Sequence, residues 1–153
     1  ILGENKIKVI RSNFFNPELT LSKRICTKIK PTRLDLENIE IGINDLNNIN
    51  AYNHVQGLVV RNKKIIIREN QKGTKKMLQS IKKDNKHFGI LLKFPKKKQD
   101  IRADLPTIGI DTLRDCKRAG IKGIVLKSKK NIFLDKQKSI KFANKNKIFI
   151  KII

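Results

Sequence analysis

The sequence predicts an α/β fold with a mixed, mostly parallel sheet and flanking helices. Short runs rich in Ile and Val alternate with amphipathic stretches of about ten residues, which is typical of strand–helix units. The run 88–94 is almost continuously apolar, as expected for a strand that is buried on both faces. At 153 residues with 39% hydrophobic residues, the chain suits one domain with an added segment.

The N-terminal part is the least regular. An alternating run at residues 7–9 predicts a short strand. Pro17 and Pro31 interrupt the segment that follows, so we expect an extended connector there. Leu and Ile at helical spacing then predict a helix over residues 35–50, with Asp35 supporting its N-terminus.

Strands and helices alternate through the rest of the chain. Residues 61–64 (RNKK) lie between two apolar runs and predict a tight hairpin turn. Asp111 or Thr112 is the expected N-cap of a later helix, and Gly120 is the expected residue just after its end. The expected strands are 55–60, 64–69, 88–94, 121–127, 131–135 and 148–153, and the expected helices are 72–84, 111–120 and 136–147.

The strong positive charge does not by itself indicate nucleic-acid binding. Lys and Arg number 36 against 13 acids, for a net charge of +23. However, Lys, Ile and Asn are enriched together, as codon bias toward A and T would produce, and the lysines are spread along the whole chain. Aromatic residues are only 5%, and no nucleic-acid-binding motif is present, so we expect no specific nucleic-acid partner. An anionic membrane surface would still attract the chain.

Metal sites built from Cys and His are not expected. Cys26 and Cys116 lack CxxC spacing, and His54 and His87 are isolated, so no set of zinc ligands is present. No apolar run reaches the roughly 18–20 residues that a membrane span requires. The chain opens with Ile1 rather than Met, which is expected of a fragment or of a processed form, and an upstream domain is left open at this point.

The stretch 93–109, KFPKKKQDIRADLPTIG, combines acids and cations between a buried strand and a helix. Ligands of α/β proteins collect at the carboxyl ends of strands, and a helix N-terminus suits a phosphate. Asp100 and Asp104 could hold a divalent cation against that phosphate. The alternative is purely structural: Arg102 pairs with a nearby acid on a solvated turn, which Pro106 and Gly109 shape.

The same stretch resembles the signature K-x-P-K-P-x-Q-[DE]-x-R-x-D-L-P-T-I-G of the LpxI-type UDP-2,3-diacylglucosamine pyrophosphatases. VQGLVV, RENQKGTKKML and the segment from RAGIKGIVLK to the end are similar to further family segments. The resemblance therefore covers the chain as a C-terminal domain plus linker. It implies that residues 1–34 are the end of an N-terminal domain and the interdomain linker, and that residues 35–153 are the catalytic domain.

The resemblance implies an enzyme of lipid A synthesis. Such enzymes hydrolyse UDP-2,3-diacylglucosamine to UMP and 2,3-diacylglucosamine 1-phosphate (lipid X), with a divalent metal, Mg²⁺ or Mn²⁺. They act in the cytoplasm, peripherally on the inner-membrane face. The missing N-terminal domain is an expected partner, and the oligomeric state, including a homodimer, is left open.

The resemblance also implies roles for individual residues. Asp104 matches the catalytic acid, as a metal ligand or as the group that orients the attacking water. Asp100 matches a less strict acidic position and is expected to support catalysis, and Glu69 is the second expected metal ligand. The residues expected to bind substrate are Lys93, Arg102, Thr107, Gly109, Gly73, Thr74 and Gln56.

Departures from the family pattern leave a second function open. Where the family has E-G-T-D, this chain has Lys72, Gly73, Thr74 and Lys75, so two acids are replaced by lysines. The family's G-Q is Val55-Gln56 here. A non-catalytic or truncated relative that binds an anionic acyl-sugar phosphate is therefore the alternative to an active hydrolase.

Overall fold

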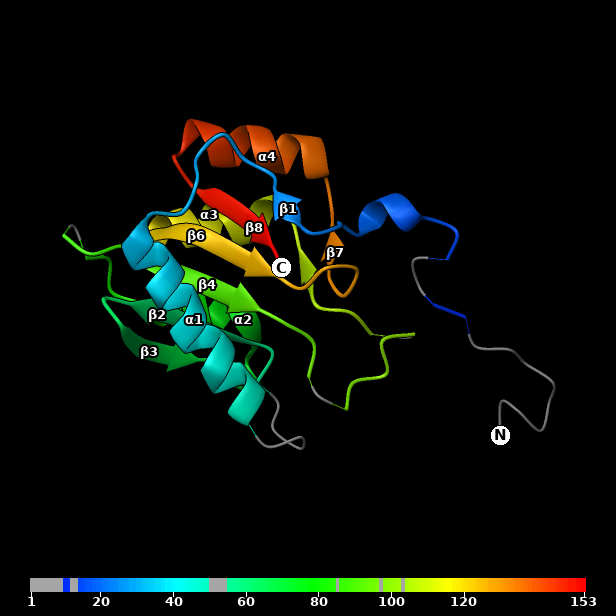
Figure 1. The fold of residues 1–153 in the computed structure, drawn as a ribbon, viewed down its shortest axis with the longest axis horizontal. Coiled ribbons are helices and arrows are strands. Elements are labelled where there is room, and N and C mark those ends of the chain that lie inside the picture. Colours follow the sequence, from blue (N-terminus) through cyan, green and yellow to red (C-terminus); the bar gives the residue numbers. More distant parts are fainter. Residues whose placement is uncertain (1–9, 12–13, 50–54, 85, 97, 103) are drawn as a thin grey trace.

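The computed structural model describes residues 10–11, 14–49, 55–84, 86–96, 98–102 and 104–153. Its main feature is a six-stranded sheet in the order β1-β8-β6-β4-β2-β3 (Figure 1). These strands are β1 (Arg24–Ile25), β2 (Gly57–Arg61), β3 (Lys64–Arg68), β4 (Gly89–Lys93), β6 (Ile121–Leu126) and β8 (Phe149–Ile152).

The predicted mixed, mostly parallel sheet is confirmed. Strands β4, β6 and β8 run parallel to one another in the centre. Strand β2 is antiparallel to both β4 and β3, so β3 shares the direction of β4. At the other edge β1 is antiparallel to β8. Four of the six strands therefore point the same way, and their carboxyl ends meet at one edge of the sheet.

Helices cover both faces of the sheet, which gives three layers (Figure 1). Helix α1 (Arg33–Asn48) packs Ile39 against one face of β2, β4, β6 and β8. The other face packs against α2 (Gly73–Ser80), α3 (Ile110–Arg118) and α4 (Lys136–Lys145). Because successive strand residues point to opposite faces, the all-apolar run Ile90–Leu92 contributes to both hydrophobic clusters. The sequence prediction of a doubly buried strand is thus confirmed.

Two helix starts differ from the predicted ones. Helix α1 begins at Arg33 because Thr32 is its N-cap: the Thr32 N–H donates to Asp35 Oδ2 at 2.9 Å, and the Asp35 N–H donates to Thr32 Oγ1 at 3.3 Å. Asp35 therefore supports the helix from its third position, as part of a capping box. Helix α3 is capped by Gly109, so the prediction of Asp111 or Thr112 as its N-cap was wrong.

The ends of α2 and α3 lie close together and share one side chain. Helix α2 ends at Ser80, four residues earlier than predicted, because Ile81 is extended. The Arg61 guanidinium donates to Lys82 O and to Ala119 O, both at 3.2 Å. Ala119 is the C-cap of α3, so the cation is favourable for that helix dipole, and Lys82 lies two residues beyond the end of α2. Gly120, with φ +70°, follows α3 as predicted.

Several short elements were not predicted. The connector contains a 3₁₀ turn, η1 (Pro17–Leu19), and the edge strand β1. A separate parallel pair joins β5 (Thr107–Ile108), which was not predicted, to β7 (Ile132–Phe133), which lies within the predicted strand 131–135 and confirms it. Two-residue strands are too short to produce an alternating pattern. The strand predicted at residues 7–9 lies outside the described residues, and the division of the chain at residue 34 stays a prediction.

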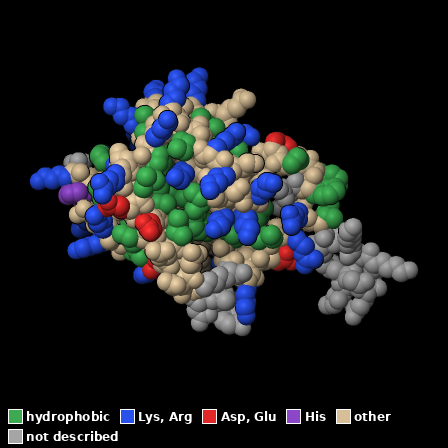
Figure 2. Space-filling view, in the orientation of Figure 1, with side chains coloured by type: hydrophobic (Ala, Val, Ile, Leu, Met, Phe, Trp, Pro, Cys, Tyr) green, Lys and Arg blue, Asp and Glu red, His purple; other side chains and the backbone are tan. Residues whose placement is uncertain are grey.

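Charged side chains are distributed widely over the surface. In Figure 2, blue Lys and Arg side chains surround green apolar surface on the visible face, and red acidic groups are sparse. Among the described residues, no helix is both long and apolar enough to cross a membrane.

Candidate active site

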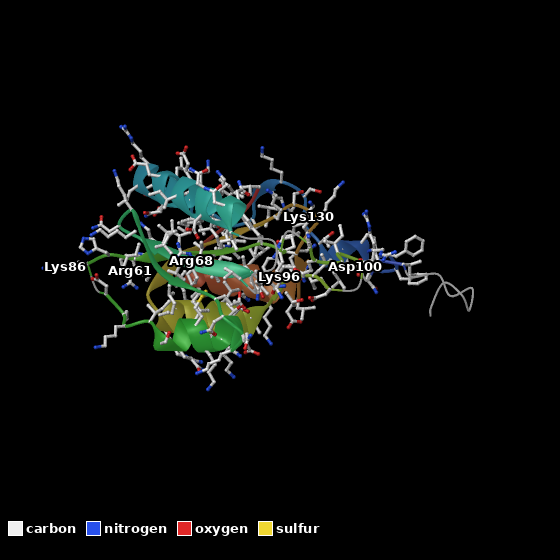
Figure 3. All side chains as sticks on the ribbon, turned by 90° about the horizontal axis from the view of Figure 1, so that it is seen from below. Arg61, Arg68, Lys86, Lys96, Asp100 and Lys130 are labelled. Carbon is white, nitrogen blue, oxygen red and sulfur yellow. The ribbon has the colours of Figure 1, made fainter. Side chains whose placement is uncertain are left out.

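The topology brings most of the predicted site residues to one edge of the sheet. Lys93 is the last residue of β4, and Glu69 directly follows β3, which runs in the same direction. Strand β2 runs in the opposite direction, so Gln56, which directly precedes β2, lies at the same edge. The loop 94–106 begins here. In Figure 3, Asp100 and Lys130 lie toward one end of the molecule, Arg61 and Lys86 lie toward the other, and Lys96 lies between them.

A chain of hydrogen bonds ties Asp104 to the sheet. Gln99 Nε2 donates to Asp104 Oδ2 at 2.6 Å, and Gln56 Nε2 donates to Gln99 Oε1 at 2.8 Å. The same Gln99 oxygen accepts from the Lys96 backbone N–H at 2.9 Å. Gln99 therefore holds the predicted catalytic acid in place, although the sequence analysis assigned it no role. Its signal was its fixed place in the loop signature.

Asp100 and Arg102 pair with each other on an exposed turn. Arg102 donates from its backbone N–H, from Nε and from Nη2 to the Asp100 carboxylate at 2.8–3.3 Å. These bonds from Arg102 lower the pKa of Asp100 to about 2. This is the local pair that the structural alternative described. The two side chains thus bond to each other, while the Asp100 carbonyl accepts from the Asp104 N–H at 3.0 Å. Their predicted roles in catalysis stay predictions.

Lys93 is a buried cation. Only 8% of the residue is exposed, and its Nζ donates to Thr74 Oγ1 at 2.7 Å. The Thr74 hydroxyl in turn donates to Glu69 Oε1 at 2.8 Å. Burial lowers the pKa of Lys93, while the charges of Glu69 and Asp104 act in the opposite direction. The structure therefore joins three predicted site residues, Lys93, Thr74 and Glu69, in one contact chain.

Asn131 clamps both ends of the loop that carries Asp104. Its Nδ2 donates to Lys93 O at 3.0 Å and to Pro106 O at 3.3 Å, and its Oδ1 accepts from the Lys127 N–H at 2.8 Å. The residue is 4% exposed. The sequence analysis missed it because an Asn after a turn is commonplace, and nothing local shows which distant carbonyls it will meet.

The remaining predicted residues shape the backbone. Gly73 opens α2 with φ +79°, and a Cβ there would meet open space. The Thr107 hydroxyl donates to Leu105 O at 3.1 Å. Gly109 caps α3, and its carbonyl accepts from the Leu113 N–H at 3.2 Å. The Thr107 hydroxyl thus bonds to the backbone of its own loop, and Gly109, which has no side chain, contributes only backbone groups.

A cavity of about 300 Å³ opens beside Gln99. One part of its lining is apolar, with Leu46, Ile49 and Phe94. The other part includes Lys96, Lys127 and Lys130, and the Lys127 ammonium lies 5.3 Å from the centre of the Phe94 ring. Such a lining suits a ligand that is both apolar and anionic.

The carboxylates differ in how well they suit a metal. Asp104 is exposed, so its carboxylate has room for a cation with its water. Glu69 is 7% exposed; its Oε1 accepts from Thr74, and its buried Oε2 has no hydrogen-bond partner. Within the described ranges, no group of three or more Cys, His, Asp or Glu side chains could surround an ion. Mg²⁺ often takes only one or two carboxylates and completes its shell with water and phosphate, so Asp104 fits it.

Comparison with known proteins agrees with these observations. The family model described as the LpxI C-terminal domain matches residues 22–151. The UDP-2,3-diacylglucosamine pyrophosphatase LpxI of Caulobacter vibrioides is 29% identical, over 87% of this chain and 50% of the relative. The chain thus spans about half the length of the curated relative that it matches.

Proposed function

Because the chain belongs to the LpxI C-terminal domain family, we propose that it hydrolyses the pyrophosphate bond of UDP-2,3-diacylglucosamine. The products would be UMP and 2,3-diacylglucosamine 1-phosphate, in lipid A synthesis. The activity is named for the Caulobacter relative. The observation that supports it here is Asp104, held by Gln99 at the sheet edge where the buried Lys93 ends β4.

The residues divide the chemistry between them. Asp104 accepts a hydrogen bond from the attacking water and aims its oxygen at the α-phosphorus. A new P–O bond forms there, the bond to the bridging oxygen breaks, and the sugar 1-phosphate leaves. The proton of the water passes to Asp104 and then to solvent. Lys93, as an ammonium, balances charge that develops on the phosphate oxygens.

A divalent metal belongs to this proposal. Asp104 would hold Mg²⁺ or Mn²⁺, which would polarise the phosphate and lower the pKa of a bound water. Glu69 was the second predicted ligand, but its oxygens face Thr74 and the protein interior. The metal site we propose therefore rests on Asp104, with water and substrate phosphate completing the shell.

The cavity beside Gln99 would receive the amphiphilic part of the substrate. Its apolar wall suits an acyl chain, and the ammonium groups of Lys96, Lys127 and Lys130 suit the sugar phosphate. The net charge of +23 would draw the chain to an anionic bilayer, where this substrate resides. We therefore place the protein in the cytoplasm, peripherally on the inner-membrane face, working with an N-terminal domain.

The direct test is release of UMP from UDP-2,3-diacylglucosamine with Mg²⁺ or Mn²⁺. The chain should be assayed alone and with the N-terminal half of the Caulobacter relative added. Asp104→Asn keeps an oxygen that can accept from Gln99 but removes the charge, so we expect at least a hundredfold loss of activity with an unchanged melting temperature. Asp45→Asn, which removes an acid paired with Arg68, is the matched control. Full activity in Asp104→Asn would contradict the assignment.

Lys72 and Lys75 favour a second function. Both are exposed at the start of α2, where the family pattern has acids. Added cations beside a phosphate site strengthen binding of an anionic product and slow its release. The chain would then hold 2,3-diacylglucosamine 1-phosphate without turnover. Tight binding of this lipid, with no UMP released in either assay mixture, would select this function over hydrolysis.

A further inference from the structure

Glu69, Thr74 and Lys93 form a buried relay at the substrate edge of the sheet. The Lys93 ammonium donates to Thr74 Oγ1 at 2.7 Å, and the hydroxyl donates onward to Glu69 Oε1 at 2.8 Å. Lys93 and Glu69 are 8% and 7% exposed. Since a buried cation is costly without an anion near it, the carboxylate of Glu69 stabilises the charged form of Lys93.

Gly57 makes the room for this relay. It lies on β2 between the other two strands: it pairs with Lys93 of β4, and its carbonyl accepts from the Glu69 N–H at 2.8 Å. A Cβ on Gly57 would lie 3.0 Å from Glu69 Oε2. The missing side chain therefore lets the carboxylate lie over the sheet, on the side of Thr74 in the first turn of α2.

The position of Glu69 does not suit a metal ligand. Its Oε1 is occupied by the Thr74 hydroxyl, and its Oε2 is buried against Gly57. A catalytic Mg²⁺ keeps most of its shell for water and substrate phosphate, and a fully buried oxygen leaves no space for that shell. The Glu69 carboxylate is instead placed to stabilise the Lys93 ammonium, through its charge and through the Thr74 hydroxyl.

We propose that Glu69 and Thr74 are positioning residues that hold the Lys93 ammonium ready for one phosphate of the substrate, and that Glu69 does not bind the metal. An ammonium has three N–H donors, and Thr74 accepts from one of them. Lys93 ends its strand where the loop of Asp104 begins, so an anion that meets this loop meets the ammonium as well. This inference rests on the proposed function for the identity of the anion only.

Two binding measurements separate the two roles of Glu69. Metal-free inorganic pyrophosphate, titrated calorimetrically in 0.3 M salt, reports on the anion site, and Mn²⁺, followed by its spin-resonance signal, reports on the metal site. The specific part of pyrophosphate binding is the part lost in Lys93→Met. Moderate salt is needed because exposed lysines bind anions weakly, and salt screens such contacts.

We expect Glu69→Gln and Thr74→Val each to weaken specific pyrophosphate binding at least tenfold and to leave Mn²⁺ affinity within about twofold. Thr74→Ser, which keeps the hydroxyl, should restore binding to near the wild-type level. The double variant should bind no more weakly than Thr74→Val alone, because both changes break one chain. Glu37→Gln removes a partly exposed acid that pairs with Lys63 and is the matched control.

The opposite pattern would overturn the inference. If Glu69→Gln lowers Mn²⁺ affinity and leaves pyrophosphate binding unchanged, Glu69 is a metal ligand; if neither changes, the relay has no role in binding. Should Glu69→Gln fail to fold, Thr74→Val still tests the relay with both charges retained. A wild-type chain that binds pyrophosphate through Lys93 but releases no UMP would refute the proposed hydrolysis and leave the relay intact.

Discussion

Replacing Asn131 with Asp changes one amide nitrogen to an oxygen and should destabilise the protein severely. In the native structure Nδ2 donates to Lys93 O at 3.0 Å and to Pro106 O at 3.3 Å, while Oδ1 accepts from the Lys127 N–H. An aspartate keeps the last of these bonds. Its second oxygen, however, would face two carbonyl oxygens in a site that is 4% exposed.

The magnitude follows from the bonds lost. Asn131→Ala removes three hydrogen bonds and leaves buried groups unpaired, which costs about 3 kcal/mol at roughly 1 kcal/mol for each bond. For a chain of this length, that cost corresponds to a fall in melting temperature of about 6–12 °C. Asn131→Asp should cost more at pH 7, because burial beside carbonyls opposes the charged form. Its pKa would be raised by folding, so the defect should shrink as the pH falls and the carboxyl group gains a proton that it can donate.

The assay is urea denaturation of both variants and the wild type at pH 7 and at pH 4.5. Asn70→Ala is the control, because Asn70 is exposed and accepts a single hydrogen bond from the Lys72 N–H. If the proposed function holds, UMP release should also fall in both Asn131 variants, since the clamp fixes the loop that carries Asp104, the proposed catalytic acid. A loss below about 1 kcal/mol in Asn131→Asp at pH 7 would refute this account, since even one unpaired buried group should cost more.

Three further outcomes test other parts of the structure. Gly123→Ala would place a Cβ 2.1 Å from the Phe149 ring; it should cost about 3 kcal/mol in a denaturation experiment, and adding Phe149→Leu should recover part of the loss. Arg102 lowers the pKa of Asp100 to about 2, so the ionised Asp100 stabilises the fold above its unfolded pKa near 4, and this effect is lost as the pH falls toward 2. The unfolding free energies of wild type and Asp100→Asn should therefore differ at pH 7 and converge between pH 4 and pH 2. A constant difference across that interval would contradict the pairing. Burial raises the pKa of the Cys116 thiol, so a thiol reagent should modify Cys116 in the unfolded protein only, and rapid labelling of the native protein would show that the core is open there.

Local pattern was sufficient for most of the fold. The uninterrupted apolar run around Leu91 indicated a doubly buried strand, and residues 61–64 indicated a hairpin, because these signals depend on neighbours in sequence. The turn contains Asn62 and Lys63, both with positive φ. The N-cap residues were less predictable. They are Thr32 and Gly109 rather than a nearby acid, because the backbone path into each helix decides which residue takes the N-cap position.

The candidate site was predictable in its place but not in its contacts. The loop signature and the rule that ligands bind at carboxyl strand ends together located Asp104 and Lys93 at one edge. The hydrogen-bond partner of Asp104, which is Gln99, was not predicted. Gln99 is itself held by a hydrogen bond from Gln56, a residue 43 positions away in the sequence. Arg102 could equally have reached a phosphate or an acid, and the turn geometry places it on Asp100.

The sequence by itself determined the alternation of strands and helices, the positive charge, and the presence of acids and cations in one loop, because composition and periodicity are local properties. Only the tertiary structure decided which polar groups meet. A hydrogen bond requires two atoms within about 3 Å, and for Lys93, Thr74 and Glu69 that distance depends on strand order, on register and on the missing side chain of Gly57. No periodic pattern specifies these three conditions, since each of them arises only when distant segments pack together.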